Sequence, residues 1–225
     1  MTPDPQQLRQ RVVTLANQAI AADEPSAWFE KLYQAADHDP DQIPWAKLAP
    51  HPQFQTWLDQ QPPIADSRAA LVIACGLGDD AEALAAKGYK VTAFDIAPTA
   101  IAWCRERFPD SSVDYQVADV LNLPPDWHGQ FDLVFECRTI QALPLSLRTE
   151  VITAIGNTVT TQGYLWVITR LREHGQTPDG PPWAMSEIEL GQLTQLGFTE
   201  CQRVSFVEAK APEISQVATL WQKAL

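Results

Sequence analysis

The stretch AALVIACGLGDD, residues 69–80, decides the fold. Its first six residues (69–74) form a near-continuous apolar run, which is typical of a parallel strand buried on both faces. Gly76-Leu77-Gly78 then predicts a tight turn, because glycine adopts backbone conformations that other residues avoid. A helical pattern over residues 79–87 follows at once and ends at Gly88. A buried strand, a glycine turn and a helix predict the start of an open α/β sheet.

The chain after this stretch alternates strand and helix patterns. Apolar runs predict further strands over residues 91–94, 113–117, 131–135 and 164–169. Helical spacing predicts helices over residues 98–107, 145–158 and 187–196. Such alternation implies a parallel sheet with right-handed crossovers. Two last strands, 204–207 and 217–220, have no helix between them and should therefore pair antiparallel. We expect a doubly wound, mostly parallel seven-stranded sheet with a C-terminal antiparallel hairpin, a Rossmann-like α/β fold.

Residues 1–66 differ from the rest because they are helical and rich in loops. Leu8, Val12 and Leu15 follow helical spacing, and Ser26 is placed to cap a second helix. A third helix is expected near residues 53–60, before Pro62 and Pro63. We expect this segment to fold as a helical lid over one edge of a core made by residues 67–225. The whole chain, residues 1–225, would then be a single domain.

Composition excludes several functions. The chain has 225 residues, with 28 acidic and 16 basic side chains and a net charge of -12. A surface this acidic repels phosphate backbones and anionic headgroups, so we expect no nucleic-acid partner and no membrane role. The longest apolar run, residues 69–75, is too short to cross a bilayer. Four separated cysteines without a CxxC pair predict no structural metal, and the polar residues 1–10 predict a cytoplasmic protein. No sequence feature predicts an oligomeric state.

Three carboxylates follow the predicted strands. Asp95 ends the second strand, 19 residues after Gly76, where it could accept hydrogen bonds from both hydroxyls of a ribose. Asp119 follows the third strand and could reach an adenine amino group, and Glu136 ends the fourth. The alternatives are that Asp95 is a solvated strand-end residue or a helix cap, and that Asp119 is a loop carboxylate. Because ligands of open α/β sheets bind at the carboxyl ends of strands, these residues and the turn converge on one rim.

The turn also satisfies the pattern G-x-G-x-x-G/A of dinucleotide binders. An NAD-type oxidoreductase is therefore one hypothesis. Asp79 and Asp80, however, would sit where a pyrophosphate has to dock, and two carboxylates are electrostatically unfavourable there. S-adenosylmethionine ends in a zwitterionic amino acid and tolerates them better. The residues favour S-adenosylmethionine as the cofactor.

The sequence resembles class I S-adenosylmethionine-dependent methyltransferases, within them the thiopurine methyltransferase-like group of thiol, halide and tellurite methyltransferases. The resemblance covers roughly residues 28–208. Four stretches carry it: FEKLY (29–33) with Pro44-Trp45; LVIACGLGDD (71–80); FDLVFE (131–136) with Ala142-Leu143-Pro144; and GPPW (180–183). Five alternating strands and a closing hairpin also favour this fold over a dehydrogenase.

The resemblance implies a role for each matching position. Tyr33 and Trp45 would line or cover the cofactor, and the Ala74 backbone would meet its amino-acid end. The other implied cofactor-binding residues are Gly76, Gly78, Asp95 with Ile96 at the ribose, Asp119 with Val120 at the adenine, and Glu136 near the sulfonium. Arg138 and Trp183 are the expected substrate-side residues. Cys137 departs from the group, because an arginine follows the fourth-strand carboxylate in thiopurine methyltransferases.

No catalytic base is apparent. The four histidines, His38, His51, His128 and His174, are isolated in loop-like contexts and are expected on the surface. Soft nucleophiles such as thiolates or halides need little or no base, because methyl transfer depends chiefly on collinear positioning. We therefore expect a methyltransferase acting on a small-molecule acceptor, possible nucleophiles being a thiol or another soft atom. The alternatives are the NAD-type oxidoreductase and a non-catalytic module that binds S-adenosylmethionine.

Overall fold

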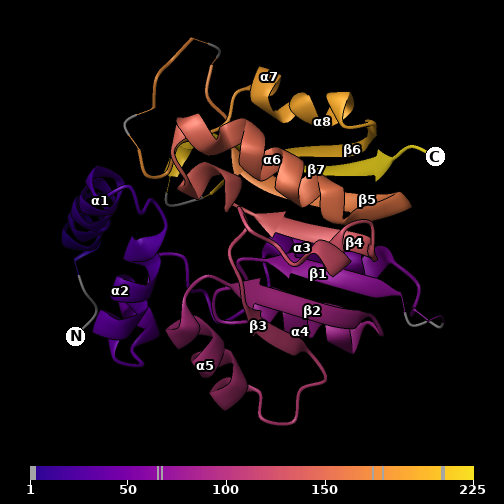
Figure 1. Ribbon diagram of the computed structural model, residues 1–225, viewed down its shortest axis with the longest axis horizontal. Coiled ribbons are helices and arrows are strands. Elements are labelled where there is room, and N and C mark those ends of the chain that lie inside the picture. Colours follow the sequence, from indigo (N-terminus) through magenta and orange to yellow (C-terminus); the bar gives the residue numbers. More distant parts are fainter. Residues whose placement is uncertain (1–3, 65, 67, 174, 179, 209–210) are drawn as a thin grey trace.

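A computed structural model describes residues 4–64, 66, 68–173, 175–178, 180–208 and 211–225. Its centre is a seven-stranded sheet in the order β3-β2-β1-β4-β5-β7-β6 (Figure 1). The strands are β1 Ala69–Ile73, β2 Lys90–Asp95, β3 Asp114–Val117, β4 Phe131–Cys137, β5 Val159–Arg170, β6 Phe198–Glu208 and β7 Ala211–Lys223. The first five pair in parallel, and β7 pairs antiparallel with both β5 and β6. The fold predicted from the sequence is confirmed.

Helices cover both faces of the sheet. α3 (Pro52–Gln60), α4 (Asp79–Ala86) and α5 (Pro98–Arg107) pack on one face, and α6 (Arg148–Thr158), α7 (Glu187–Leu190) and α8 (Gln192–Gln195) pack on the other. Alternate residues of β1 serve the two cores: Leu71 faces the α6 side and Val72 the α3 side. Burial on both faces explains why β1 reads as a continuous apolar run. None of the described helices is long and apolar enough to cross a membrane.

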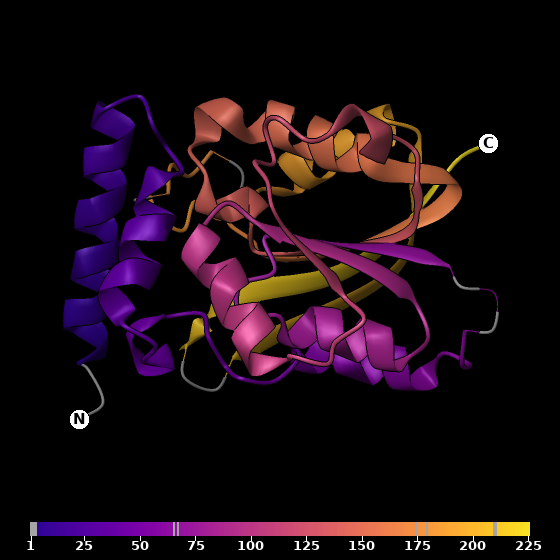
Figure 2. The same cartoon turned by 60° about the horizontal axis from the view of Figure 1, so that its bottom comes forward.

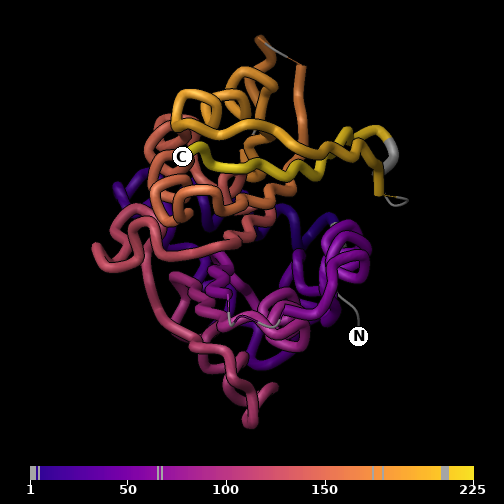
Figure 3. The backbone as a smooth tube through the Cα atoms, turned by 90° about the vertical axis from the view of Figure 1, so that its right-hand side faces the viewer, coloured from indigo at the N-terminus to yellow at the C-terminus, as the bar shows by residue number. Residues whose placement is uncertain are grey.

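The C-terminal strands are much longer than the sequence indicates. β6 and β7 run side by side as a long antiparallel hairpin (Figure 3), whereas their apolar patterns mark only residues 204–207 and 217–220. The reason is that β6 is an edge strand with one largely exposed face, so polar residues interrupt its apolar pattern. The helix expected over 187–196 also divides at Gly191 into α7 and α8. β5 begins directly after α6, before Gly163.

The N-terminal segment divides into two parts. α1 (Pro5–Ala21) and α2 (Ala27–Ala36) stand together at one end of the sheet (Figures 1 and 2) and pack against Leu77 and the start of α5. Glu30 of α2 accepts hydrogen bonds from the amide (3.0 Å) and hydroxyl (2.6 Å) of Thr99 in the first turn of α5. α3 instead contributes to the core on the sheet face. Ser26 occupies the N-cap of α2 but makes no side-chain capping bond.

Candidate active site

The glycine turn, residues 74–78, begins where β1 ends. Ala74, Gly76 and Gly78 all have positive φ, at 46°, 57° and 90°, and the Cys75 amide donates to the Phe94 carbonyl at 2.8 Å. A Cβ added to Gly78 would lie 2.5 Å from the Tyr115 hydroxyl, so a larger side chain does not fit at this position. Gly78 is therefore required by internal packing as well as by the tight turn that the sequence predicts, and its part in binding a ligand stays a prediction.

Asp95 lies against this turn at the end of β2. Its Oδ2 accepts from the Gly76 amide at 3.0 Å and its Oδ1 from the Ala97 amide at 2.9 Å. The side chain is buried, and burial raises the pKa of Asp95 to about 6, although the amide bonds oppose the shift. Each carboxylate oxygen keeps a second lone pair. Asp95 is thus fixed in one orientation with acceptor capacity left for a ligand.

Two aromatic residues from the N-terminal segment cover the turn. The Trp45 indole donates to the Tyr33 hydroxyl at 2.8 Å, and a Cβ added to Gly76 would lie 3.4 Å from that hydroxyl. Tyr33 is buried, and burial, followed by the negative charge of Asp95, raises the pKa of its phenol well above the ordinary range. The structure therefore brings together Tyr33, Trp45, Gly76 and Asp95, which the sequence places in three separate stretches.

The loop after β3 continues the same rim. The Ala118 amide donates to the Asp95 carbonyl at 3.1 Å, which joins the ends of β2 and β3. Asp119 is half-buried, and its Oδ1 accepts from the Leu121 amide at 3.0 Å. Val120 is buried in the α6-side core and Ile96 is half-buried. Asp119 is therefore held in a local turn beside the residues predicted at the ribose.

Glu136 ends β4 and is the most deeply buried carboxylate of the rim, at 0% exposure. It pairs in register with Ile73, the last residue of β1. Its Oε1 accepts from the amides of Thr139 (2.5 Å) and Ile140 (2.9 Å), whereas Oε2 has no partner among the described residues. Burial raises the pKa of Glu136 to about 7, against those amide bonds and two neighbouring arginines. One carboxyl oxygen is thus buried and available.

The two substrate-side residues lie beyond Glu136. Arg138, at φ 66°, donates to Gln216 Oε1 at 2.5 Å and forms an ion pair with Glu208. Trp183 is bound through its main chain, and its indole packs directly on Gly180, where a Cβ would overlap the ring. Among the described residues, no hydrogen bond or aromatic contact joins Trp183 to the glycine turn. Arg138 therefore belongs to the rim, and the Trp183 indole shapes its own loop.

The paired aspartates of the turn are both engaged within the protein. Asp79 forms a two-point ion pair with Arg107, at 3.0 and 2.8 Å. Asp80 accepts from the His51 amide at 2.7 Å, and burial raises its pKa to about 7. Two carboxylates with fixed partners occupy the start of α4. This arrangement disfavours a pyrophosphate there, as the sequence analysis argued.

One of the histidines departs from the expectation of a surface position. His51 is half-buried against Phe206, its Nδ1 accepts from the Gln53 amide at 3.3 Å, and burial lowers its pKa to about 4. His51 thus caps α3 in its neutral form. The sequence signal for this role is Pro52, because proline is common at the first position of a helix. His38 and His128 are exposed, and His174 lies outside the described residues.

Two residues of the rim were missed. Arg170 is the last residue of β5, and Gln216 faces it in register on β7. A strand-end position was the available signal for Arg170, but the expected strand ended one residue earlier. Nothing in the sequence pattern marks Gln216. Within the described part of the chain, no three His, Cys, Asp or Glu side chains form a group suited to a metal ion.

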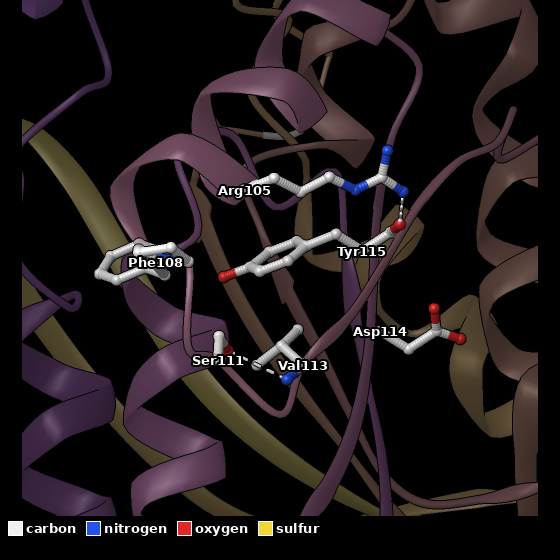
Figure 4. A pocket seen from close by; sticks show the side chains of 7 residues that line it. Arg105, Phe108, Ser111, Val113, Asp114 and Tyr115 are labelled. Carbon is white, nitrogen blue, oxygen red and sulfur yellow. Dashed lines mark hydrogen bonds between the residues drawn. The ribbon is translucent and has the colours of Figure 1, made fainter.

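A surface cavity of about 210 Å³ lies elsewhere (Figure 4). It is lined by Arg105, Phe108, Pro109, Ser111, Val113, Asp114 and Tyr115, from the end of α5 to the start of β3. Arg105 crosses it to donate to the Tyr115 carbonyl at 2.5 Å. None of the residues expected to bind a ligand lines this cavity, and it has no part in the site.

The comparisons with known proteins decide the family. The family model described as thiopurine S-methyltransferase matches residues 29–222, most of the chain. The chain belongs to the thiopurine S-methyltransferase family. It is accordingly an S-adenosylmethionine-dependent methyltransferase, and the NAD-type oxidoreductase is not supported. No curated protein sequence matches it.

Solved structures share the fold of this thiopurine S-methyltransferase family member. N-methyltransferase NodS from Bradyrhizobium japonicum WM9, in complex with S-adenosyl-L-homocysteine, is 21% identical, with 85% of this chain and 98% of that chain covered and a TM-score of 0.65. A protein solved in work on conversion of a disulfide bond into a thioacetal group during echinomycin biosynthesis is 21% identical over 87% and 93%, with a TM-score of 0.66. TehB from Haemophilus influenzae is 16% identical over 80% and 64%, with a TM-score of 0.63.

The rim of this family member has the chemistry that S-adenosylmethionine requires. A carboxylate with spare lone pairs stands at the end of β2, and Gly76 lies close to the Tyr33 hydroxyl and the Trp45 ring. Glu136 adds a buried, unpartnered oxygen on the β4 side of the turn. Negative and aromatic groups suit a ligand that carries a positive sulfonium.

Proposed function

We propose that this protein transfers a methyl group to a soft nucleophilic atom, a thiol sulfur being the first candidate, on a small-molecule acceptor. The observation that carries the proposal is the clustering of Tyr33, Trp45, Gly76 and Asp95 at one rim, beside the unpartnered Glu136. A rim that is covered by Tyr33 and Trp45 favours a small acceptor over a macromolecule. The acidic surface also argues against a nucleic-acid or membrane partner.

Each residue of the cluster has a task in this proposal. Asp95, held by two amides, would bind the ribose hydroxyls, with Ile96 beside it, and Asp119 with Val120 would hold the adenine. Tyr33 and Trp45 would cover the ligand, so that α1 and α2 act as the lid. The Ala74 backbone would bind the amino-acid end. When bound, S-adenosylmethionine supplies an electrophilic methyl group.

The chain's own contribution to the reaction is positioning and exclusion of water. An in-line displacement gains much of its acceleration from holding the nucleophile, the methyl carbon and the departing sulfur collinear. A soft nucleophile needs no strong base, and the described rim holds no exposed histidine that would serve as one. Glu136, with a pKa near 7, is placed to hold a proton at Oε2 and release it within the neutral range. The four cysteines are free thiols, which supports a reducing, cytoplasmic location.

The test is calorimetric titration followed by an acceptor screen. S-adenosylhomocysteine should bind at micromolar concentration and NAD should not. Methyl transfer should then be measured with thiols, halides and amines as acceptors, by the formation of S-adenosylhomocysteine. Turnover with a thiol supports the proposal. Binding without turnover on any acceptor would contradict it and favour a non-catalytic S-adenosylmethionine-binding module.

A further inference from the structure

Arg170 is a partly buried cation at the carboxyl end of β5. Its side chain donates no hydrogen bond and forms no ion pair with any described residue, and its Nε is fully buried. Burial, followed by the positive charge of Arg138, lowers the pKa of Arg170. Glu208 and Glu213 partly oppose this shift, but neither contacts the guanidinium, so an anion bound directly to it would stabilise the buried charge.

Gln216 supplies a second donor without an acceptor. It is 1% exposed and pairs in register with Arg170, so both side chains project from the same face of the sheet. Its Oε1 accepts from Arg138, which leaves its Nε2 unpartnered among the described residues. A buried amide N–H that lacks a partner costs about 1–3 kcal/mol. Arg170 and Gln216 thus each have a buried N–H group that lacks an acceptor among the described residues.

Arg138 completes the group. Its Nη2 bonds both Gln216 and Glu208, but its Nε is buried and unpartnered. The three residues, Arg138, Arg170 and Gln216, are called the donor cluster below. Arg138 follows β4 two residues after Glu136, so the cluster adjoins the unpartnered carboxyl of the methyl-transfer rim.

We propose that the donor cluster of Arg138, Arg170 and Gln216 is the recognition site for a carboxylate group on the methyl acceptor. The inference rests on the proposed function, because it names the class of acceptor for that same rim. Three N–H donors suit the two oxygens of a carboxylate, which accepts several hydrogen bonds in its plane.

The charge of the cluster selects a single negative charge. Glu208 forms an ion pair with Arg138, whereas Arg170 forms none within the described residues. Glu208 and Glu213 both lie near enough to act on Arg170. A singly charged carboxylate is repelled less by these two glutamates than a dianionic phosphate would be.

The experiment measures binding, not turnover. The protein, saturated with S-adenosylhomocysteine, is titrated with benzoate and benzamide, and with 3-mercaptopropionate and its amide. We expect at least one carboxylate to bind ten-fold or more tightly than its own amide. Arg170→Gln should reduce this preference to two-fold or less, and Arg170→Lys, which keeps the charge, should retain part of it. Arg68→Gln, at an exposed position directly before β1 and therefore at the amino end of the parallel strands, is the matched control and should change nothing.

Two results would overturn the inference. One is equal binding of each carboxylate and its amide to the unaltered protein. The other is an undiminished preference in Arg170→Gln, provided that its thermal melting shows a folded protein. Failure of the proposed function gives a different result, since S-adenosylhomocysteine itself would then not bind or no acceptor would be methylated. In that case the carboxylate titration without S-adenosylhomocysteine still decides whether the donor cluster binds a carboxylate.

Discussion

The rim at the carboxyl ends of the parallel strands has two halves, which differ in whether their buried polar groups have hydrogen-bond partners. On the β1–β2 half, Asp95 has both oxygens bound by backbone amides and Asp79 is paired with Arg107. On the β4–β5–β7 half, four buried polar atoms have no partner among the described residues: Glu136 Oε2, Arg138 Nε, Arg170 Nε and Gln216 Nε2. Both halves belong to the same seven-stranded sheet.

This contrast separates two kinds of binding site. The β1–β2 half is fixed by local backbone geometry and is ready for a constant ligand. The β4–β5–β7 half carries free donors and an unpartnered carboxyl, which a ligand would satisfy. A cofactor shared by many enzymes suits the first half, and a particular acceptor suits the second.

The largest effect is expected where the β1–β2 half depends on packing. Gly78→Ala places a methyl group 2.5 Å from the Tyr115 hydroxyl and 3.2 Å from Cys104 Sγ, at a φ of 90°. Backbone strain and overpacking together should lower the free energy of unfolding by about 2–5 kcal/mol. Urea denaturation measures it. Gly129→Ala, with positive φ and open space around it, is the control. Backbone strain alone should lower its free energy of unfolding, by about 1–2 kcal/mol. Equal losses in the two variants would contradict the packing role.

The second prediction concerns Glu136, whose carboxyl group lies on the β4–β5–β7 half. The pKa of Glu136 is raised from 4.5 to about 7, so the folded protein holds a proton there that the unfolded chain releases at lower pH. Stability therefore falls as pH rises from about 4.5 to about 7. Glu136→Gln keeps the two amide bonds through its oxygen and removes this loss. At pH 8 the variant should be more stable than the unaltered protein by about 3 kcal/mol, and near pH 4 the difference should vanish. A difference independent of pH in urea denaturation would refute the raised pKa.

The third prediction removes the ribose carboxylate. Asp95→Ala should weaken the binding of S-adenosylhomocysteine by about ten- to hundred-fold, through loss of hydrogen bonds worth about 1–3 kcal/mol. Calorimetry measures the affinity. Asp114→Ala removes an exposed carboxylate from β3 and should bind normally. If a folded Asp95→Ala binds as the unaltered protein does, Asp95 is not part of the site.

The smallest effect is expected at the covering aromatic residues. Tyr33→Phe removes the acceptor of the Trp45 indole and keeps the ring. Loss of one hydrogen bond, about 0.5–1.5 kcal/mol, should speed the release of S-adenosylhomocysteine by about two- to ten-fold. Stopped-flow displacement measures the rate. Tyr89→Phe, outside the rim, is the control. An unchanged rate would mean that Tyr33 and Trp45 do not hold the lid.

The same contrast explains how much the sequence could predict. The β1–β2 half was readable because one continuous stretch, residues 69–80, forms the turn and Asp95 follows at the next strand end. Tyr33 and Trp45 were found only through the family resemblance, since their contact with Gly76 depends on tertiary packing. Arg170 and Gln216 were missed because two strands far apart in sequence create their pairing. The packing of Gly78 against Tyr115 could not be predicted, because a glycine motif does not show which atoms face it.

The length of β6 illustrates a second limit. Apolar patterning detects a strand only where its side chains are buried, and β6 alternates largely exposed and half-buried residues. The main-chain pairing with β7 extends it far beyond residues 204–207. His51 illustrates a further limit: it was expected on the surface, but Phe206 of the distant strand β6 packs against it, and no local pattern around residue 51 shows this contact.

The most direct test is a crystal structure of the protein grown with S-adenosylhomocysteine. We expect the ribose hydroxyls to bind Asp95 and the ligand to lie against Tyr33 and Trp45. S-adenosylhomocysteine should make no contact with the donor cluster, which then remains accessible to an acceptor. A ligand bound away from Asp95, or one whose carboxylate occupies Arg170 and Gln216, would contradict the division of the rim into a cofactor half and an acceptor half.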